Sequence, residues 1–175
     1  METRSAKTVV LGLGNILHAD DGAGPQAIGR LRTDPRVPAD VSLVEGGTLG
    51  LELLPYVWDC ARLIVIDAVD VAEPPGTLVR MSGEELSSLP GKSSVHQLGV
   101  SDLLVALRML AERQPLVVLL GVQPGSTDWT HELSPPVAAT MDSLIEAIIR
   151  ELQAQAEPAA PPAEIQKQSG EAPPP

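Results

Sequence analysis

The sequence predicts a three-layer α/β sandwich built around a mostly parallel β-sheet, and three observations lead to this fold class. Strand-like and helix-like segments alternate in the order β-α-β-α-β-β-α-β-α between about residues 7 and 153 of the 175. The strand-like segments are continuous apolar runs, as expected of parallel strands that are buried on both faces. The chain has no Phe, two Trp and one Tyr, so its core must be built from aliphatic side chains.

Five segments have the composition of β-strands. The segment LIVI is the most apolar of them, and it ends in Asp67. The segment GTLVRM alternates and follows Pro74 and Pro75, which suits the edge of a sheet. The strands are expected at residues 8–13, 41–44, 63–67, 76–81 and 116–121.

Four segments carry apolar side chains at helical spacing. Pro25 stands where a first helical turn begins, Thr48 can cap a second helix, and Ser134 with Pro135 can begin the last one. His96 stands at or just before the start of the third helix. The side chains expected on the buried faces are Ala27, Ile28, Leu31, Leu51, Leu54, Val57, Val100, Leu103, Leu104, Leu107, Leu110, Val137, Met141, Leu144, Ile145, Ile148 and Leu152.

The composition of the chain changes after Gln153. Residues 154–175 hold six Pro and six Ala, and their single large apolar residue is Ile165. Such a segment cannot bury enough surface to offset the entropy that ordering costs. We therefore expect one folded domain over residues 1–153 and a disordered, acidic Pro/Ala-rich tail over residues 154–175.

Charge, cysteine content and hydropathy exclude several classes of protein. The formal net charge of −11 disfavours a nucleic-acid partner. The single cysteine, Cys60, excludes an internal disulfide and a thiolate metal cluster, and we expect it to be a small buried residue. The first apolar run lacks a signal-peptide cleavage site, and no run approaches the roughly 20 residues that span a bilayer. The sequence thus predicts a cytoplasmic protein without membrane insertion.

Acidic residues follow the ends of two predicted strands. Asp20 and Asp21 come after the first strand, Asp67 ends the third, and His96 follows the loop before the third helix. Ligands of parallel sheets bind beside the carboxyl ends of the strands, where we expect these segments to meet. Two carboxylates and an imidazole suit a divalent ion such as Ni²⁺ or Zn²⁺. The residues alone also allow plainer roles, namely an Asx turn for either first aspartate, a loop cap for Asp67 and a local bond for His96.

The glycine-rich stretch VVLGLGNILHADDGAG matches a dinucleotide-binding motif in part. Gly12 and Gly14 follow a strand, but Leu17 stands where the third glycine is needed, and acidic residues stand where pyrophosphate requires bare amides. Glu45 lies farther along the chain than the roughly 20 residues expected of a ribose-binding acid. The dinucleotide motif is therefore rejected, and no Walker loop, HExxH or GxSxG motif is present.

Five motifs occur in order along the chain: GLGNILHADDGAG, EGGTLG, VIDAVD, SVHQLG, and GVQP with ELSPPV. On these motifs the chain resembles the nickel-iron hydrogenase maturation endopeptidases from Val9 to Leu152. The resemblance implies an α/β/α sandwich with a five-stranded sheet in which GTLVRM is the one antiparallel strand. It also implies that the protein removes a short C-terminal extension from the hydrogenase large-subunit precursor after nickel insertion.

The resemblance assigns both metal-binding and catalytic roles to Asp21, Asp67 and His96. Relatives hold a divalent cation at these positions that stands for the nickel of the substrate, so we expect the substrate to supply nickel and expect no organic cofactor. Glu45 matches a position where relatives commonly carry Asp, and it is expected near the substrate. His18 departs from the apolar or small residue of relatives, and we expect it to be an exposed turn residue.

The mechanism implied by the resemblance begins with nickel that the cysteines of the precursor still hold. Asp21, Asp67 and His96 bind this nickel, and the ion, or a water held by a carboxylate, assists hydrolysis. The expected partner is the nickel-loaded precursor, and the protein is expected to be a monomer before the complex forms.

Two other classes of function stay open at this point. A non-catalytic, chaperone-like nickel-binding protein on the same scaffold would leave the mass of the precursor unchanged. A flavodoxin-like nucleotide or flavin binder would carry a chromophore or gain thermal stability with nucleotide. The scarcity of aromatic side chains, which would stack on a flavin ring, disfavours the second class.

Overall fold

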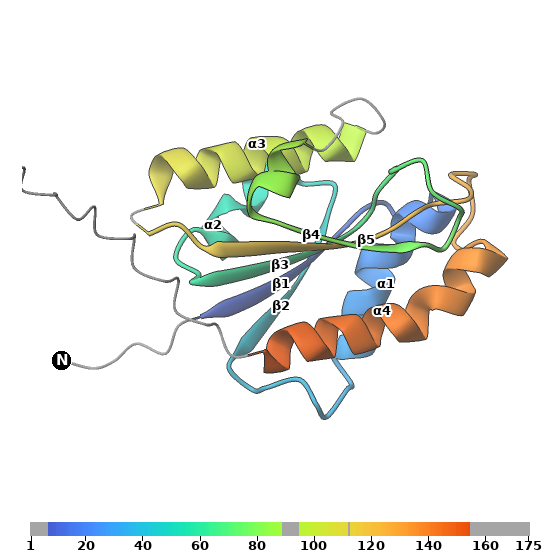
Figure 1. Ribbon diagram of the computed structural model, residues 1–175, viewed down its shortest axis with the longest axis horizontal. Coiled ribbons are helices and arrows are strands. Elements are labelled where there is room, and N and C mark those ends of the chain that lie inside the picture. Colours follow the sequence, from blue (N-terminus) through green and yellow to red (C-terminus); the bar gives the residue numbers. More distant parts are fainter. Residues whose placement is uncertain (1–6, 89–94, 112, 155–175) are drawn as a thin grey trace, which may run out of the picture.

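The computed structural model describes residues 7–88, 95–111 and 113–154, which form a five-stranded sheet covered by helices on both faces (Figure 1). The strand order is β2-β1-β3-β5-β4. The strands are β1 (Thr8–Leu13), β2 (Val41–Gly47), β3 (Arg62–Ala68), β4 (Leu78–Ser82) and β5 (Leu116–Val122). Four strands are parallel, and β4 pairs antiparallel with β5 at one edge. The predicted fold class and the single antiparallel strand are confirmed.

Helices form the two outer layers, above and below the sheet in Figure 1. Helices α1 (Ala23–Leu31) and α4 (Pro135–Gln153) pack on one face of the sheet, and α2 (Leu54–Val57) and α3 (Val95–Leu110) pack on the other. Three short 3₁₀ helices complete the structure: η1 (Ala19–Gly22), η2 (Gly50–Leu53) and η3 (Gly83–Ser88). In the part of the chain that the structure describes, no helix combines the length and the apolar character that a membrane span needs.

Each face of the sheet has its own apolar core. Val10 and Ile64 pack beneath α1 and α4, whereas Val9 and Leu63 pack beneath α2 and α3. Side chains alternate across a strand, so a strand that is covered on both faces must be apolar at every position. This explains the continuous apolar runs of the sequence. Cys60 is a buried free thiol in the second core, as predicted.

The segment after Thr48 differs from its prediction. The sequence predicts one helix that buries Leu51, but the structure has η2 followed by the single turn of α2. Leu51 is exposed, and Leu53 is buried in its place. Pro55 has no N–H to donate to an earlier turn, so it prevents one continuous α-helix through this segment.

The first helix begins earlier than predicted, and the third ends with an exposed residue that was expected to be buried. Helix α1 begins two residues before Pro25, and Leu110, expected on the core face of α3, is exposed in its last turn. Helix α4 begins at Pro135 and ends at Gln153, as predicted. The predicted tail lies, except for Ala154, outside the described residues, so the domain division stays a prediction.

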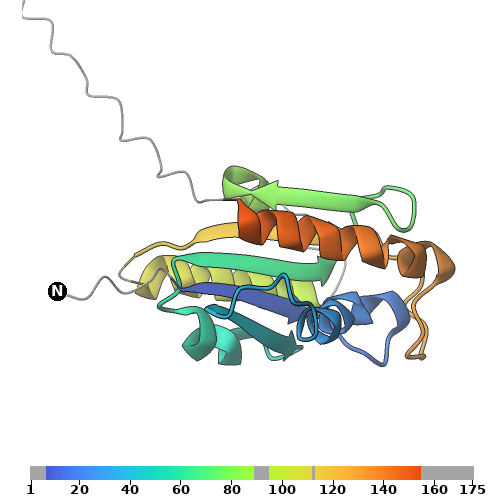
Figure 2. The ribbon, with the colours of Figure 1, turned by 90° about the horizontal axis from the view of Figure 1, so that it is seen from below.

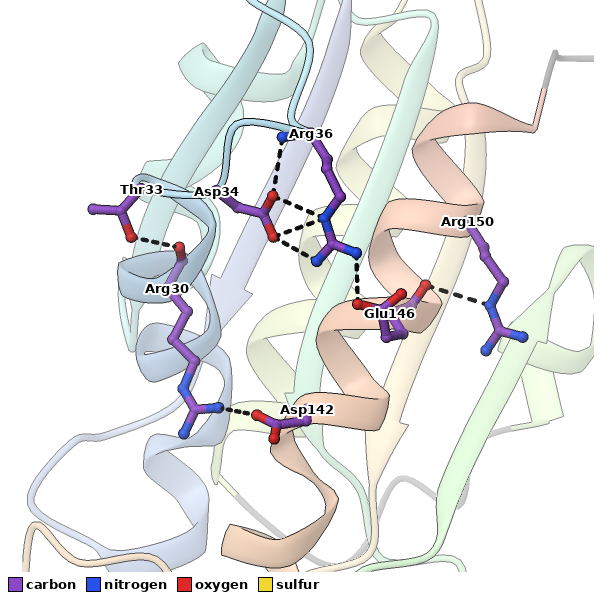
Figure 3. Close-up of polar contacts among 7 residues, drawn as sticks. All are labelled: Arg30, Thr33, Asp34, Arg36, Asp142, Glu146 and Arg150. Carbon is purple, nitrogen blue, oxygen red and sulfur yellow. Dashed lines mark hydrogen bonds and ion pairs between the residues drawn. The ribbon is translucent and has the colours of Figure 1, made fainter.

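Ion pairs link α1 and the turn after it to α4 on the outer surface (Figure 3). Arg30 Nη1 lies 2.9 Å from Asp142 Oδ1, and Arg36 contacts Glu146 at 2.6 Å and Asp34 at 2.7 Å. Near the other end of α4, the carboxylate of Glu151 accepts hydrogen bonds from Arg62 and Arg80. The guanidinium groups hold the pKa of Asp34 down at about 2 and lower that of Glu151.

Candidate active site

The glycine-rich stretch after β1 folds the chain back over the carboxyl ends of the strands. Gly14 has φ +115°, and a Cβ there would lie 1.8 Å from the backbone oxygen of Asp21. A Cβ on Gly24 would lie 2.2 Å from the carbonyl oxygen of Leu13 and 2.7 Å from that of Ile66. Only glycine permits these close approaches. The glycines therefore serve backbone packing that brings η1 onto the ends of β1 and β3.

Asp21 and Asp67 meet at this edge of the sheet. The Asp21 side chain is on η1, and its Oδ2 accepts a hydrogen bond of 2.7 Å from the backbone N–H of Asn15. Asp67 is the last residue but one of β3, and its Oδ1 accepts one of 2.8 Å from the N–H of Ala68. The two residues are only 8% and 2% exposed. Two carboxylates from distant parts of the sequence thus share a site with little solvent.

Burial and like charge shift the pKa of Asp67. Desolvation, and secondarily the negative charge of Asp21, raise the pKa of Asp67 to about 7. A carboxyl group with a pKa near neutrality can accept or donate a proton at physiological pH. Positive charge near the pair would favour its ionised form instead, so the same oxygens suit a cation. The geometry is that of an acid–base or cation-binding site.

His96 comes from helix α3, in the layer that Asp67 faces. Asp67 follows Val65 by two residues and so faces the layer of α2 and α3. Helix α3 ends at Leu110, shortly before the amino end of β5. Helix α3 therefore begins beside the carboxyl ends of the parallel strands (Figure 1). The backbone of His96 is in the first turn of α3, as predicted.

The third predicted ligand cannot be placed atom by atom, because the side chain of His96 lies outside the described residues. Among the side chains that are described, no group of three or more His, Cys, Asp or Glu could hold a metal ion. Asp21 and Asp67 supply two carboxylate ligands, and a borderline divalent ion requires at least one more donor. The donor chemistry fits the predicted ion, and the predicted ligand set stays a prediction.

Asp20 has a role that the sequence did not indicate. Its carboxylate is fully buried and accepts hydrogen bonds of 2.6–2.8 Å from the backbone N–H groups of Gly125, Ser126 and Ser134 and from the Ser134 hydroxyl. An Asx turn is therefore the wrong reading of Asp20, because the carboxylate binds the loop between β5 and α4 and not its own turn. Ser134 precedes α4 as predicted, but its hydroxyl bonds Asp20 and caps no helix amide.

Glu45 stands apart from this pair. Its neighbour Gly46 faces the core beneath α2, so Glu45 faces the α1 layer, opposite to Asp67. Its Oε2 lies 3.2 Å from Arg32 Nη1, just after α1. The structure does not bring Glu45 together with Asp21 and Asp67, and its substrate-binding role stays a prediction.

His18 is partly buried, in contrast to the exposed turn residue that we expected. Its ring lies 4.2 Å from that of Trp129, measured between centroids, and its Nδ1 is 3.2 Å from the carbonyl oxygen of Thr127. The backbone N–H of Ala19 donates to the carbonyl of Thr130. The loop after β1 is thus joined side by side to the loop before α4 (Figures 1 and 2).

Comparisons with known proteins identify the family of the chain and agree with its fold. The sequence model of the hydrogenase maturation protease family matches residues 25–151. The chain is 38% identical over 151 residues to the hydrogenase expression/formation protein HupD of Rhodobacter capsulatus, covering 85% of this chain and 72% of that protein. It is 36% identical over 149 residues to the hydrogenase 2 maturation protease of Escherichia coli, covering 84% and 91%.

Solved structures agree as well. The hydrogenase maturating endopeptidase HybD from E. coli superposes with a TM-score of 0.79 at 35% identity, covering 84% of this chain and 92% of that one. HybD from Thermococcus kodakarensis, a [NiFe] hydrogenase maturation protease, gives a TM-score of 0.71 at 30% identity, covering 83% and 99%. The chain therefore belongs to the hydrogenase maturation protease family, and it is an endopeptidase.

Proposed function

We propose that this endopeptidase removes the C-terminal extension of a nickel-iron hydrogenase large-subunit precursor after nickel has been inserted. The observation that carries the proposal is the pair of buried carboxylates, Asp21 and Asp67, at the carboxyl edge of the sheet in a member of this family. The pair has the chemistry to bind a cation or to move a proton, and a metal-gated peptidase needs both abilities.

Recognition of nickel would use the two carboxylates together with His96. Both carboxylates are held by backbone N–H groups, so they are oriented before the substrate arrives. The nickel belongs to the precursor and is part of the substrate, so the protease needs no resident ion of its own. A precursor without nickel would lack the positive charge that these carboxylates attract, and it would bind weakly.

Hydrolysis would use the same pair as an acid–base group. Because the pKa of Asp67 is raised to about 7, this carboxyl group can carry a proton near neutral pH before the substrate binds. The charge of the substrate's nickel favours the ionised carboxylate, which can hold a water at the scissile carbonyl and accept its proton as the water attacks the carbonyl carbon. The same carboxyl group would then donate this proton to the leaving amine as the C–N bond breaks. The metal itself would polarise that carbonyl as a Lewis acid.

The remaining proposals concern where the protein acts, its oligomeric state and its contacts with the precursor. The protein would act in the cytoplasm as a monomer that forms a transient complex with the precursor. Glu45 would contact the substrate only if the precursor reaches past the end of β1 to the α1 side, where Glu45 pairs with Arg32.

The experiment is to incubate the purified protein with the same precursor in nickel-loaded and nickel-free forms and to follow the mass of the precursor. We expect a loss of the extension from the nickel-loaded form alone. Equal cleavage of both forms would refute recognition through nickel. An unchanged mass in both reactions, with binding of the nickel-loaded form retained, would favour the non-catalytic nickel-binding alternative.

A further inference from the structure

Exposed apolar side chains gather on the two loops that flank the candidate active site. Ile16 and Leu17 belong to the loop after β1, and Trp129 belongs to the loop before α4. Trp129 is 78% exposed, an unusual position for the largest apolar side chain. We name these three residues the apolar rim. Exposed apolar residues that cluster beside a site mark surfaces that bind a partner.

The two loops that carry the apolar rim are tied to aspartates of the candidate site. The backbone N–H of Asn15, next to Ile16, donates to Oδ2 of Asp21. On the other loop, Asp20 binds the backbone N–H groups of Gly125 and Ser126, shortly before Trp129. The adjacent residues Asp20 and Asp21 thus hold the two loops that carry the apolar rim.

The structure holds the rim in an exposed position. His18 packs its ring against Trp129 and lies 3.2 Å, through Nδ1, from the carbonyl oxygen of Thr127. The backbone N–H of Ala19 bonds the carbonyl of Thr130. These contacts fix the tryptophan from one side and leave most of its surface to solvent, so little ordering is needed when a partner covers it.

We propose that the apolar rim is the docking surface for an apolar segment of the large-subunit precursor next to its nickel site. This inference rests on the proposed function and adds a contact outside the predicted ligand set. Tryptophan is enriched among the residues that carry most of the binding energy at protein interfaces. The rim would hold the body of the precursor while the carboxylates read its metal.

The test uses fluorine NMR of the protein labelled with 5-fluorotryptophan, which has two signals because the chain has two Trp. Trp129→Phe and Trp58→Phe assign the signals. Trp58 follows α2 and is 59% exposed, so it is a matched control outside the rim. Unlabelled nickel-loaded precursor is then added, with Asp21→Asn in the labelled protein to prevent turnover. We expect the Trp129 signal to shift and the Trp58 signal to stay.

A shift of the Trp58 signal alone, or of neither signal in a complex shown to form by sedimentation, would overturn the docking surface. A Trp129 shift that follows the concentration of the protease alone would assign the rim to a second copy of this chain and would overturn it too. The outcome does not depend on cleavage. If the Trp129 signal shifts but the wild type never shortens the precursor, the proposed function fails while the docking surface stands.

Kinetics provide a second, independent measurement. Trp129→Ala and Leu17→Ser are expected to raise the KM for nickel-loaded precursor about tenfold or more, with a smaller change in kcat. Trp58→Ala is expected to leave both constants unchanged. Equal KM values for Trp129→Ala, Leu17→Ser and the wild type would refute the rim while leaving the protease activity intact.

Discussion

The pKa of Asp67 in the candidate site is raised, whereas the pKa values of Asp34 and Glu151 on the outer surface near α4 are lowered. Asp67 is buried beside another carboxylate, and its pKa rises to about 7. Asp34 accepts hydrogen bonds from the guanidinium of Arg36, and its pKa falls to about 2 (Figure 3). The surroundings of an aspartate therefore decide whether it stabilises the fold at neutral pH or opposes it. Carboxylates that oppose folding persist at sites where function requires them.

The largest effect is expected on activity from Asp21→Asn. The amide keeps the size of the side chain but removes the charge that would face the substrate's nickel, and we expect processing to fall by at least about 100-fold. The melting temperature should change little, because the hydrogen bond from Asn15 can be kept by the amide oxygen. Mass spectrometry of the precursor measures the activity, and wild-type processing by this variant would remove Asp21 from the site.

His96→Ala tests the third predicted ligand in the same assay. The expected outcome is a comparable loss of processing, since the imidazole would be one of three groups that hold the substrate's nickel. Circular dichroism should report an unchanged fold. Normal processing by His96→Ala would limit the site to the two carboxylates.

The next effect is expected on stability from Asp20→Ala. Three backbone N–H groups and one hydroxyl would lose their acceptor, which should cost about 3 kcal/mol or more in the free energy of unfolding. Urea denaturation measures it. Ser134→Ala removes only the hydroxyl donor and should cost about 1 kcal/mol. Equal effects of the two variants would mean that Asp20 is not the anchor of the loop.

The third effect is the pH dependence of stability, which distinguishes Asp67 from the carboxylates of the outer surface. The pKa of Asp67 is about 7 in the folded state, and its ordinary value is 3.8. As pH rises, Asp67 therefore loses its proton at a lower pH in the unfolded state than in the folded state. Its contribution to stability is full below about pH 4 and is lost as pH rises through 7. Asp67→Asn should therefore become more stable than the wild type as pH rises, by a few kcal/mol at pH 8. Urea titrations between pH 5 and 8 provide the measurement, and a difference that does not depend on pH would contradict the assignment.

The smallest effect is expected at the outer surface from Glu151→Gln. The guanidinium groups of Arg80 and Arg62 lower the pKa of Glu151, so its contribution is present at neutral pH and is lost as pH falls through the lowered folded-state pKa. We expect a loss of about 1 kcal/mol at pH 7 that disappears in acid. Asp142→Asn, whose side chain is 95% exposed, should have less effect. If Glu151→Gln lost more stability in acid than at pH 7, the pKa of Glu151 would not be lowered, and this residue would no longer contrast with Asp67.

The sequence was sufficient for the fold because the fold depends on local patterns. Continuous apolar runs indicated strands buried on both faces, and the alternation of strands with helices indicated a parallel sheet. The prediction was wrong at Leu51: Pro55 was expected to limit the length of the helix after Thr48, but the segment is divided into η2 and α2, which leaves Leu51 exposed. Periodicity alone does not report such an interruption.

The sequence by itself also placed Asp21 and Asp67 at the ends of strands, because parallel strands bring their carboxyl ends to one edge. Only the tertiary structure decided how adjacent aspartates divide their roles. Asp20 binds Gly125 and Ser134, more than 100 residues later, whereas Asp21 accepts a hydrogen bond from Asn15 and its charge acts on Asp67. Neighbours in sequence point in different directions on η1, and no local pattern encodes which distant loop each direction meets.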